Sequence, residues 1–136
     1  MIGDGISTEK GAPYIIHCTT KWVVPDRMTS WTWTLTRKGK DKPTATYAGI
    51  VYWKESTNEV LGTCVTDDGT TNTEKMTRFG VIVERKRTGS GRKGDFTETE
   101  VIDWSNPDRP SSVLTVQFKN GEKVVTRSSL QRQKKN

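Results

Sequence analysis

The chain has 136 residues, only 31% of them apolar, and its Lys and Arg residues exceed its Asp and Glu residues by 22 − 16 = 6. This length fits one ordinary domain or two very small ones, and it excludes a multidomain enzyme. Twenty-one threonines, twelve glycines and five tryptophans stand where a helical bundle would carry Leu, Ala and Met. Because Thr, Val and aromatic residues favour strands and Gly favours turns, the composition predicts an all-β protein.

Alternation of apolar and polar residues predicts eight short antiparallel strands. The clearest is Ser30–Arg37, where Trp31, Trp33 and Leu35 share one face and three threonines share the other. Gly, Asn, Asp and Pro separate the strands, and Asn120-Gly121 predicts a two-residue type I′ hairpin. In chain order the predicted strands are Tyr14–Val24, Ser30–Arg37, Thr44–Lys54, Glu59–Thr66, Arg78–Arg87, Phe96–Trp104, Ser112–Lys119 and Lys123–Leu130.

Eight such strands fit either one barrel or sandwich, or two small barrels in tandem. The Gly-rich residues 1–11 are expected to form a flexible arm, and residues 132–136 a basic tail. Between them, residues 12–76 form a β-rich first half, which is either a first small barrel or an extension of the second, and residues 77–131 form the second half.

The second half has a characteristic order of motifs. Arg78-Phe-Gly-Val-Ile-Val is followed by a polar hairpin, then Glu100-Val-Ile-Asp-Trp, Val113-Leu-Thr-Val-Gln-Phe-Lys-Asn-Gly and Lys123-Val-Val-Thr-Arg-Ser-Ser-Leu. This order resembles the Tudor/KOW-type small barrel, an SH3-like fold that also occurs in short basic bacteriophage proteins and in integrase C-terminal domains. The resemblance covers about 40% of the chain. It implies a five-stranded barrel and a role in binding nucleic acid, methylated side chains or proteins.

The inventory of reactive side chains argues against catalysis. The single histidine, His17, is adjacent to Cys18, and neighbouring strand residues point to opposite faces, so the two cannot form a nucleophile–base pair. One His and two Cys match no zinc spacing. We expect no enzyme activity, no cofactor and no metal site.

Two acidic pairs have simpler explanations than cation binding. Asp67-Asp68-Gly69 is typical of a turn, and Glu98 and Glu100 alternate as the solvent face of a strand does. The two cysteines, Cys18 and Cys64, are too few for a disulfide scaffold, so free thiols are expected and one bridge is left open.

Lys and Arg gather in three groups that we expect on hairpin tips and at the C-terminus. Glycines in such a tip allow close approach to a phosphate, and clustered cations give affinity that depends on salt. The sequence therefore predicts a small basic binding module that contacts DNA or RNA. The candidate residues are Arg85, Lys86, Arg87, Arg92 and Lys93; Arg37, Lys38, Lys40 and Lys42; and Arg127, Arg132, Lys134 and Lys135.

Two other functions remain open. Threonine-rich strands and terminal arms also fit a virion structural or assembly protein that docks onto a protein partner or onto copies of itself. Trp31 and Trp33, expected with Trp22 and Trp53 to build the core of the first half, would alternatively line a small-ligand barrel.

The sequence also bears on location. The N-terminus lacks the basic and apolar regions of a signal peptide, and no apolar run reaches the roughly 18 residues of a membrane helix. We therefore expect an intracellular (cytoplasmic) or virion location without membrane association.

Overall fold

The computed structural model describes residues 2–9 and 12–132 of the chain. These residues form ten antiparallel strands, each hydrogen-bonded to its neighbours along the chain, and the first strand pairs with the last to close a barrel. An up-and-down barrel of this kind leaves no free sheet edge. The strands are β1 (Ile2–Glu9), β2 (Ala12–Val24), β3 (Met28–Arg37), β4 (Ala45–Lys54), β5 (Glu59–Thr66), β6 (Thr71–Phe79), β7 (Ile82–Gly91), β8 (Gly94–Asp103), β9 (Ser111–Phe118) and β10 (Lys123–Arg132).

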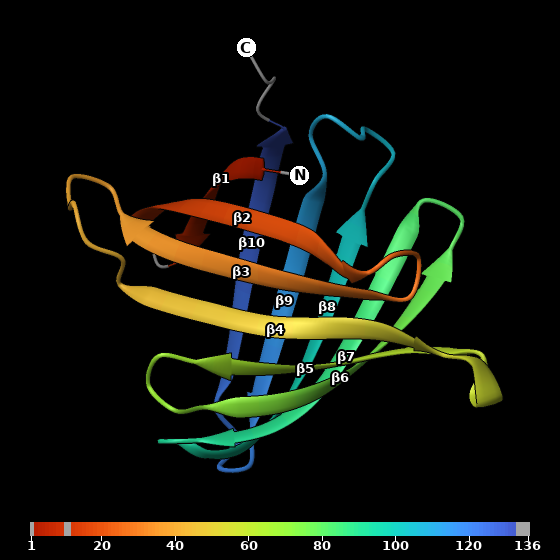
Figure 1. Ribbon diagram of the computed structural model, residues 1–136. Helices are drawn as coiled ribbons and strands as arrows, with labels where there is room; N and C mark the ends of the chain where they lie inside the picture. Colours follow the sequence, from red (N-terminus) through yellow and green to blue (C-terminus); the bar gives the residue numbers. More distant parts are fainter. Residues whose placement is uncertain (1, 10–11, 133–136) are drawn as a thin grey trace.

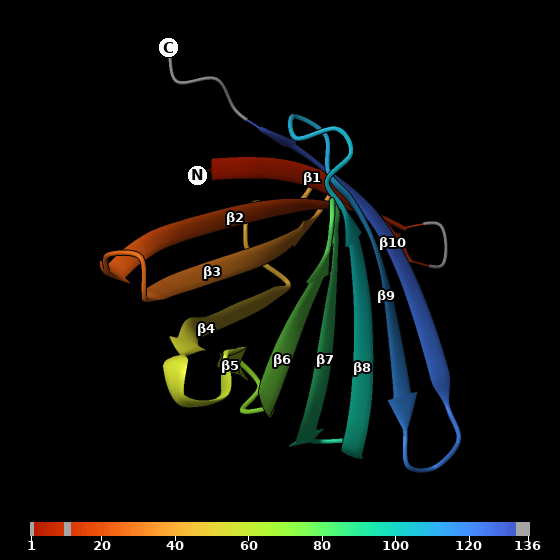
Figure 2. The same cartoon turned by 90° about the vertical axis from the view of Figure 1, so that its right-hand side faces the viewer.

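The two sides of the barrel cross each other. In Figure 1, β2, β3 and β4 run across the view in front of β8, β9 and β10, which lie close to vertical. Figure 2 shows the same two groups of strands facing each other from the side. One 3-10 helix, η1 (Glu55–Thr57), lies between β4 and β5.

The turns fall into two sets at opposite ends of the barrel. Residues 38–44, 67–70, 92–93 and 119–122 connect strand pairs at one end, which we call the mouth. Residues 25–27, 55–58, 80–81 and 104–110 connect strand pairs at the other, which we call the far end. The mouth turns lie along the left and lower side of Figure 1 and the far-end turns along its right and upper side.

Side chains alternate between the interior and the outer face, as the period of a strand requires. In β8, Phe96, Glu100 and Ile102 are buried, whereas Thr97 and Val101 between them are exposed. The interior is not a close-packed apolar core: among the described residues, no large apolar residue is fully buried. This leaves room for a cavity.

The all-β antiparallel prediction is confirmed, and seven of the eight predicted strands occur with shifted ends. The predicted strand Arg78–Arg87 instead spans the end of β6, the turn at residues 80–81 and the first part of β7. The number differs because β1 and β6 were not predicted. β1 lies in the segment expected to be a flexible arm, where it pairs with β2 and β10.

The expected division at residues 76 and 77 does not appear. β6 runs through it and pairs with both β5 and β7, so residues 77–131 do not close into an SH3-like barrel of their own. The two halves are consecutive parts of one larger barrel.

Two predicted turns occur at the expected places. Asp67, Asp68 and Gly69 form the β5–β6 turn, with Gly69 at a φ of +85°. The turn at Asn120-Gly121 is longer than predicted, spanning residues 119–122. Only Gly121 has a positive φ there, and type I′ requires two such residues, so the predicted turn type is wrong.

Candidate functional site

A cavity of about 580 Å³ occupies the barrel interior. This volume lies within the range of roughly 300–1,000 Å³ that is usual for small-molecule sites. Its exposed lining residues, among them Asp67, Asp68, Arg92 and Lys93, lie in the mouth turns or directly beside them, so the cavity opens there. Further inside, its wall includes Ile16, Trp31, Trp33, Leu35, Tyr47, Cys64, Asn72, Arg85, Arg87, Phe96, Glu98, Glu100, Leu114, Val116 and Thr126.

Five charged side chains from three adjacent strands meet inside the barrel. We call them the ion network: Glu74 from β6, Arg85 and Arg87 from β7, and Glu98 and Glu100 from β8. Arg85 donates to both carboxylate oxygens of Glu74, with Nη2 2.7 Å from Oε2 and 3.0 Å from Oε1. Arg87 donates to Glu74, Glu98 and Glu100 over 3.0, 3.0 and 2.7 Å.

The network is shielded from solvent to different degrees. The side chain of Glu74 is 0% exposed and that of Glu100 4%, whereas that of Glu98 is 18% exposed. Burial raises the pKa of Glu98 above its ordinary value, although the hydrogen bond from Arg87 opposes this. Burial alone would lower the pKa of Arg87, but the charges of Glu100, Glu98 and Glu74 raise it, so the guanidinium stays charged.

Aromatic rings cover the wall opposite the charges. Trp31 and Trp33 meet edge to face with ring centroids 6.3 Å apart, and the guanidinium carbon of Arg85 lies 5.5 Å from the centroid of the Trp31 ring. Burial raises the pKa of the Tyr47 phenol to about 12, and the charge of Glu98 adds to this shift. The two indole rings, the Tyr47 phenol and the Glu98 carboxylate therefore line the same cavity.

Two buried polar atoms in the cavity wall have no hydrogen-bond partner among the described residues: Nε1 of Trp31 and Oδ1 of Asn72. Asn72 is only 8% exposed. An unpaired buried polar group costs about 1–3 kcal/mol. Such a group at a cavity wall is a place where a ligand gains a hydrogen bond.

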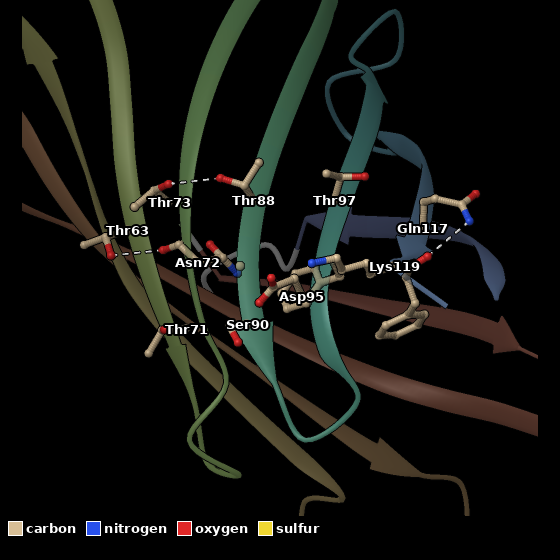
Figure 3. A pocket seen from close by; sticks show the side chains of 13 residues that line it. Thr63, Thr71, Asn72, Thr73, Thr88, Ser90, Asp95, Thr97, Gln117 and Lys119 are labelled. Carbon is tan, nitrogen blue, oxygen red and sulfur yellow. Dashed lines mark hydrogen bonds between the residues drawn. The ribbon is translucent and has the colours of Figure 1, made fainter. Parts of the chain in front are cut away.

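A second hollow, of about 730 Å³, lies on the outer face of β5 to β9 (Figure 3). Thr63, Thr73, Thr88 and Thr97 follow one another in register across four strands there, and Thr73 and Thr88 approach to 3.4 Å. This groove is wide open, and no ion pair joins the described residues that line it. The interior cavity is the better candidate site although its volume is smaller.

Two of the predicted phosphate-binding residues occupy unexpected positions. Arg85 and Arg87 were expected on a hairpin tip, but β7 continues to Gly91 and both side chains point into the barrel, 6% and 8% exposed. Their charges are taken by Glu74, Glu98 and Glu100. The expected solvent position of Glu98 and Glu100 is wrong for the same reason, because their inward register places them beside Phe96 and Ile102.

The other predicted cations divide between the mouth and the outer face. Arg92 and Lys93 form the tip of the β7–β8 turn, and the group from Arg37 to Lys42 lies in and beside the β3–β4 connection at the same end. Lys86 and Arg127 are exposed on the outer face. Arg132 ends β10, and its side chain is outside the described part, as are Lys134 and Lys135.

The tryptophans also divide. Trp31, Trp33 and Leu35 share one face as predicted, but they line a cavity in place of a solid core. Trp22 and Trp53 were expected inside, yet they are 62% and 48% exposed at the far end. Trp53 lies beside Arg27, whose guanidinium carbon is 5.8 Å from its ring centroid.

His17 is exposed on β2, and Cys18 and Cys64 are free thiols. Burial raises the pKa of both thiols, which makes them poor nucleophiles. No group of three or more His, Cys, Asp and Glu within residues 2–9 and 12–132 could hold a metal ion.

The ion network itself was missed by the sequence reasoning. A signal existed in the period-two pattern of β8, where Phe96 and Ile102 have the same parity as Glu98 and Glu100. Arg85 and Arg87 in the preceding strand are also two residues apart, so they were the matching opposite charges for Glu98 and Glu100.

Comparisons with known proteins support the fold. No protein-family model matches the chain, and no curated protein matches its sequence. Within the described part, no helix is long and apolar enough to cross a membrane. Among solved structures, the chain is similar to the crystal structure of Rv2717c from M. tuberculosis, with a TM-score of 0.67 and 14% identity over 98% of this chain and 90% of that one. At this identity, the likeness establishes a shared barrel fold over nearly the whole chain.

Proposed function

We propose that this protein is a non-enzymatic binding protein that holds a small organic molecule inside its barrel. The observation that carries the proposal is the cavity of about 580 Å³, which opens at the mouth and combines aromatic walls with a charged cluster. Apolar walls with a few fixed polar groups are the usual composition of small-molecule sites.

The rigidity of the charged groups also supports binding. Each guanidinium of the ion network is held by at least two carboxylates, so the polar groups need little reordering when a ligand arrives. Preorganised polar groups raise affinity because less side-chain entropy is lost on binding.

Titration with N-phenyl-1-naphthylamine, a neutral apolar fluorophore, tests this proposal. The emission of the probe should rise and saturate at one probe per chain. Thr126→Phe adds a ring to the cavity wall, whereas Val125→Phe adds the same ring to the outer face of the same strand, where Val125 is 39% exposed. Thr126→Phe should abolish the signal and Val125→Phe should keep it. Absence of probe binding, or equal binding by both variants, would contradict the proposal.

Nucleic-acid binding is a second candidate, and one observation favours it. Lys38, Lys40 and Lys42 are exposed at the same end of the barrel as Arg92 and Lys93, so two groups far apart in sequence form one basic rim. Asp41, Asp67 and Asp68 at the same end reduce its net charge. Binding to mixed-sequence DNA and RNA should weaken steeply with salt and be lost in Lys40→Glu/Arg92→Glu. Binding that is insensitive to salt would exclude this candidate. The predicted virion or assembly role stays a prediction.

A further inference from the structure

The ion network contains one more carboxylate than guanidinium. Glu74 accepts from both arginines, and Glu100 likewise lies within 3.5 Å of Arg85 and 2.7 Å of Arg87. Glu98 accepts from Arg87 alone. Glu98 is therefore the least compensated carboxylate, and at 18% exposure it is also the most accessible member of the network.

A second acceptor lies in the same cavity wall. Asn72, on β6, is 8% exposed, and its Oδ1 has no hydrogen-bond partner among the described residues. Asn72 lies two residues before Glu74 on β6, so the two residues are on the same face of the strand. It is therefore one inward-facing position away from the row in which Glu74 pairs with Arg87 and Arg87 pairs with Glu98. A carboxylate with a single guanidinium donor and an amide oxygen with no donor fit a ligand that brings N–H groups.

The aromatic wall favours the same kind of ligand. Trp31 already lies against the guanidinium of Arg85, so one ring of this wall contacts a cation through its face. Trp33, Tyr47 and Phe96 also line the cavity, and the ring of Tyr47 is close enough to Glu98 for the carboxylate to raise its phenol pKa.

We propose that the ligand is a small organic cation, namely an aromatic or alkyl amine whose ammonium group binds Glu98 and Asn72 while its apolar part lies against Trp33 and Tyr47. This inference rests on the proposed function, since it assumes that the cavity is the binding site. An anion would instead meet the surplus carboxylate, and the arginines that could attract it are already bound to Glu74 and Glu100.

Amine binding should depend on pH through Glu98. The groups around this carboxyl are Arg85 and Arg87 from β7, Glu100 from β8, Tyr47 from β4 and Cys64 from β5. Because burial raises the pKa of Glu98, its charge is lost at a higher pH than the ordinary 4.5. The affinity for an amine should therefore fall as the pH is lowered through the raised pKa of Glu98, while the affinity for a neutral analogue should stay constant.

Calorimetric titration with three analogues of one shape tests the inference. The probes are 1-naphthylmethylamine, 1-naphthalenemethanol and 1-naphthoic acid, which are cationic, neutral and anionic at neutral pH. We expect the amine to bind about tenfold more tightly than the alcohol, as a charge-assisted hydrogen bond would provide. The acid should bind most weakly.

Glu98→Gln keeps the shape of the side chain and removes its charge. It should bring the ratio of amine to alcohol affinity close to one. Glu59→Gln makes the same change on a far-end residue that pairs with Lys75 outside the cavity, and it should keep the wild-type ratio. The pH profile of the wild-type protein gives a second readout that needs no variant.

The outcomes separate the two proposals. If the alcohol binds as tightly as the amine, or the acid binds more tightly, the ligand class is wrong and the cavity remains a binding site. If N-phenyl-1-naphthylamine binds but none of the three analogues does, the ligand class is again wrong. If neither that probe nor any analogue binds, the proposed function fails and this inference fails with it.

Discussion

Arg87 Nη2 lies 2.7 Å from Glu100 Oε2 inside the barrel, although the strand register pairs Arg87 with Glu98 and Arg85 with Glu100. The guanidinium of Arg87 thus reaches diagonally and joins two register positions of β8 as well as Glu74 of β6. A barrel of this size has an interior that its side chains need not fill, and here three strands place ionised groups in it. Charge therefore defines the chemistry of the cavity.

Removal of Arg87 should destabilise the protein strongly. Arg87→Ala leaves Glu98 with no guanidinium donor and takes one donor from each of Glu74 and Glu100. The loss of one partner from a buried ionic cluster costs about 3–5 kcal/mol. Urea unfolding measures this change as a lower midpoint.

Lys86→Ala is the matched control, because the side chain of Lys86 is 68% exposed on the same strand. It should change the free energy of unfolding by about 0.5 kcal/mol or less. Equal effects of the two variants would show that the ion network contributes nothing specific to stability.

Glu98→Gln should stabilise the ligand-free protein at neutral pH. The raised pKa of Glu98 means that its ionised form is disfavoured in the folded state. Wild-type stability from this group is therefore greatest below the unfolded-state pKa and decreases as the pH rises through the folded-state pKa. Gln has no charge to bury and its amide oxygen still accepts from Arg87, so the melting temperature should rise by a few degrees.

The pH dependence provides the check on that explanation. The difference in melting temperature between Glu98→Gln and the wild-type protein should shrink as the pH is lowered through the raised folded-state pKa of Glu98 toward the ordinary Glu value of 4.5. A difference that stays constant across this range would mean that the charge of Glu98 is not its cause.

Gly62→Ala should disturb the ion network from a neighbouring strand. A Cβ at Gly62 would lie 2.6 Å from Oε1 of Glu74 and 2.6 Å from the backbone oxygen of Ile50. One of these groups must move, and Glu74 is the carboxylate shared by both arginines. We expect a loss of about 1–3 kcal/mol in unfolding free energy.

Thr97→Ala serves as the control for Gly62→Ala, since Thr97 is exposed on the outer face of β8. Its unfolding midpoint in urea should stay close to that of the wild-type protein. A wild-type midpoint for Gly62→Ala as well would show that the interior has more space beside Glu74 than the structure indicates.

The tryptophans allow binding to be followed without a label. Trp33 lines the cavity, whereas Trp22 is 62% exposed at the far end. A ligand in the cavity should therefore change the emission of the Trp22→Phe variant as it changes that of the wild-type protein. Trp33→Phe should lose much of the change. The opposite pattern would place the ligand at the far end.

The sequence predicted the fold class and most of the strands because apolar alternation is strong where one face of a strand meets apolar neighbours. Ser30–Arg37 is such a case, and Trp31, Trp33 and Leu35 do face inward. β6 was missed because its inward residues include Asn72 and Glu74, so its alternation is not one of apolar and polar residues. β1, with glycines at positions 3 and 5, carries no alternating apolar signal either.

The site was predicted less well than the fold for a related reason. Charged residues on a strand are usually assigned to its solvent-exposed face. That assumption placed four residues of the ion network outside the barrel: Arg85, Arg87, Glu98 and Glu100. Only pairing between β6, β7 and β8 shows that the opposite charges meet. The motifs in residues 77–131 are signals for turns and strands in general. A ten-stranded barrel contains the same kinds of turn and strand, so these motifs do not distinguish it from an SH3-like barrel.

A crystal structure determined with bound 1-naphthylmethylamine would show whether a small molecule binds inside the barrel. We expect the naphthyl ring to lie against Trp33 and Tyr47, with the amine nitrogen within hydrogen-bond distance of Glu98. A ligand found only in the outer groove of β5 to β9 or at the far end, with the barrel interior unchanged, would contradict it.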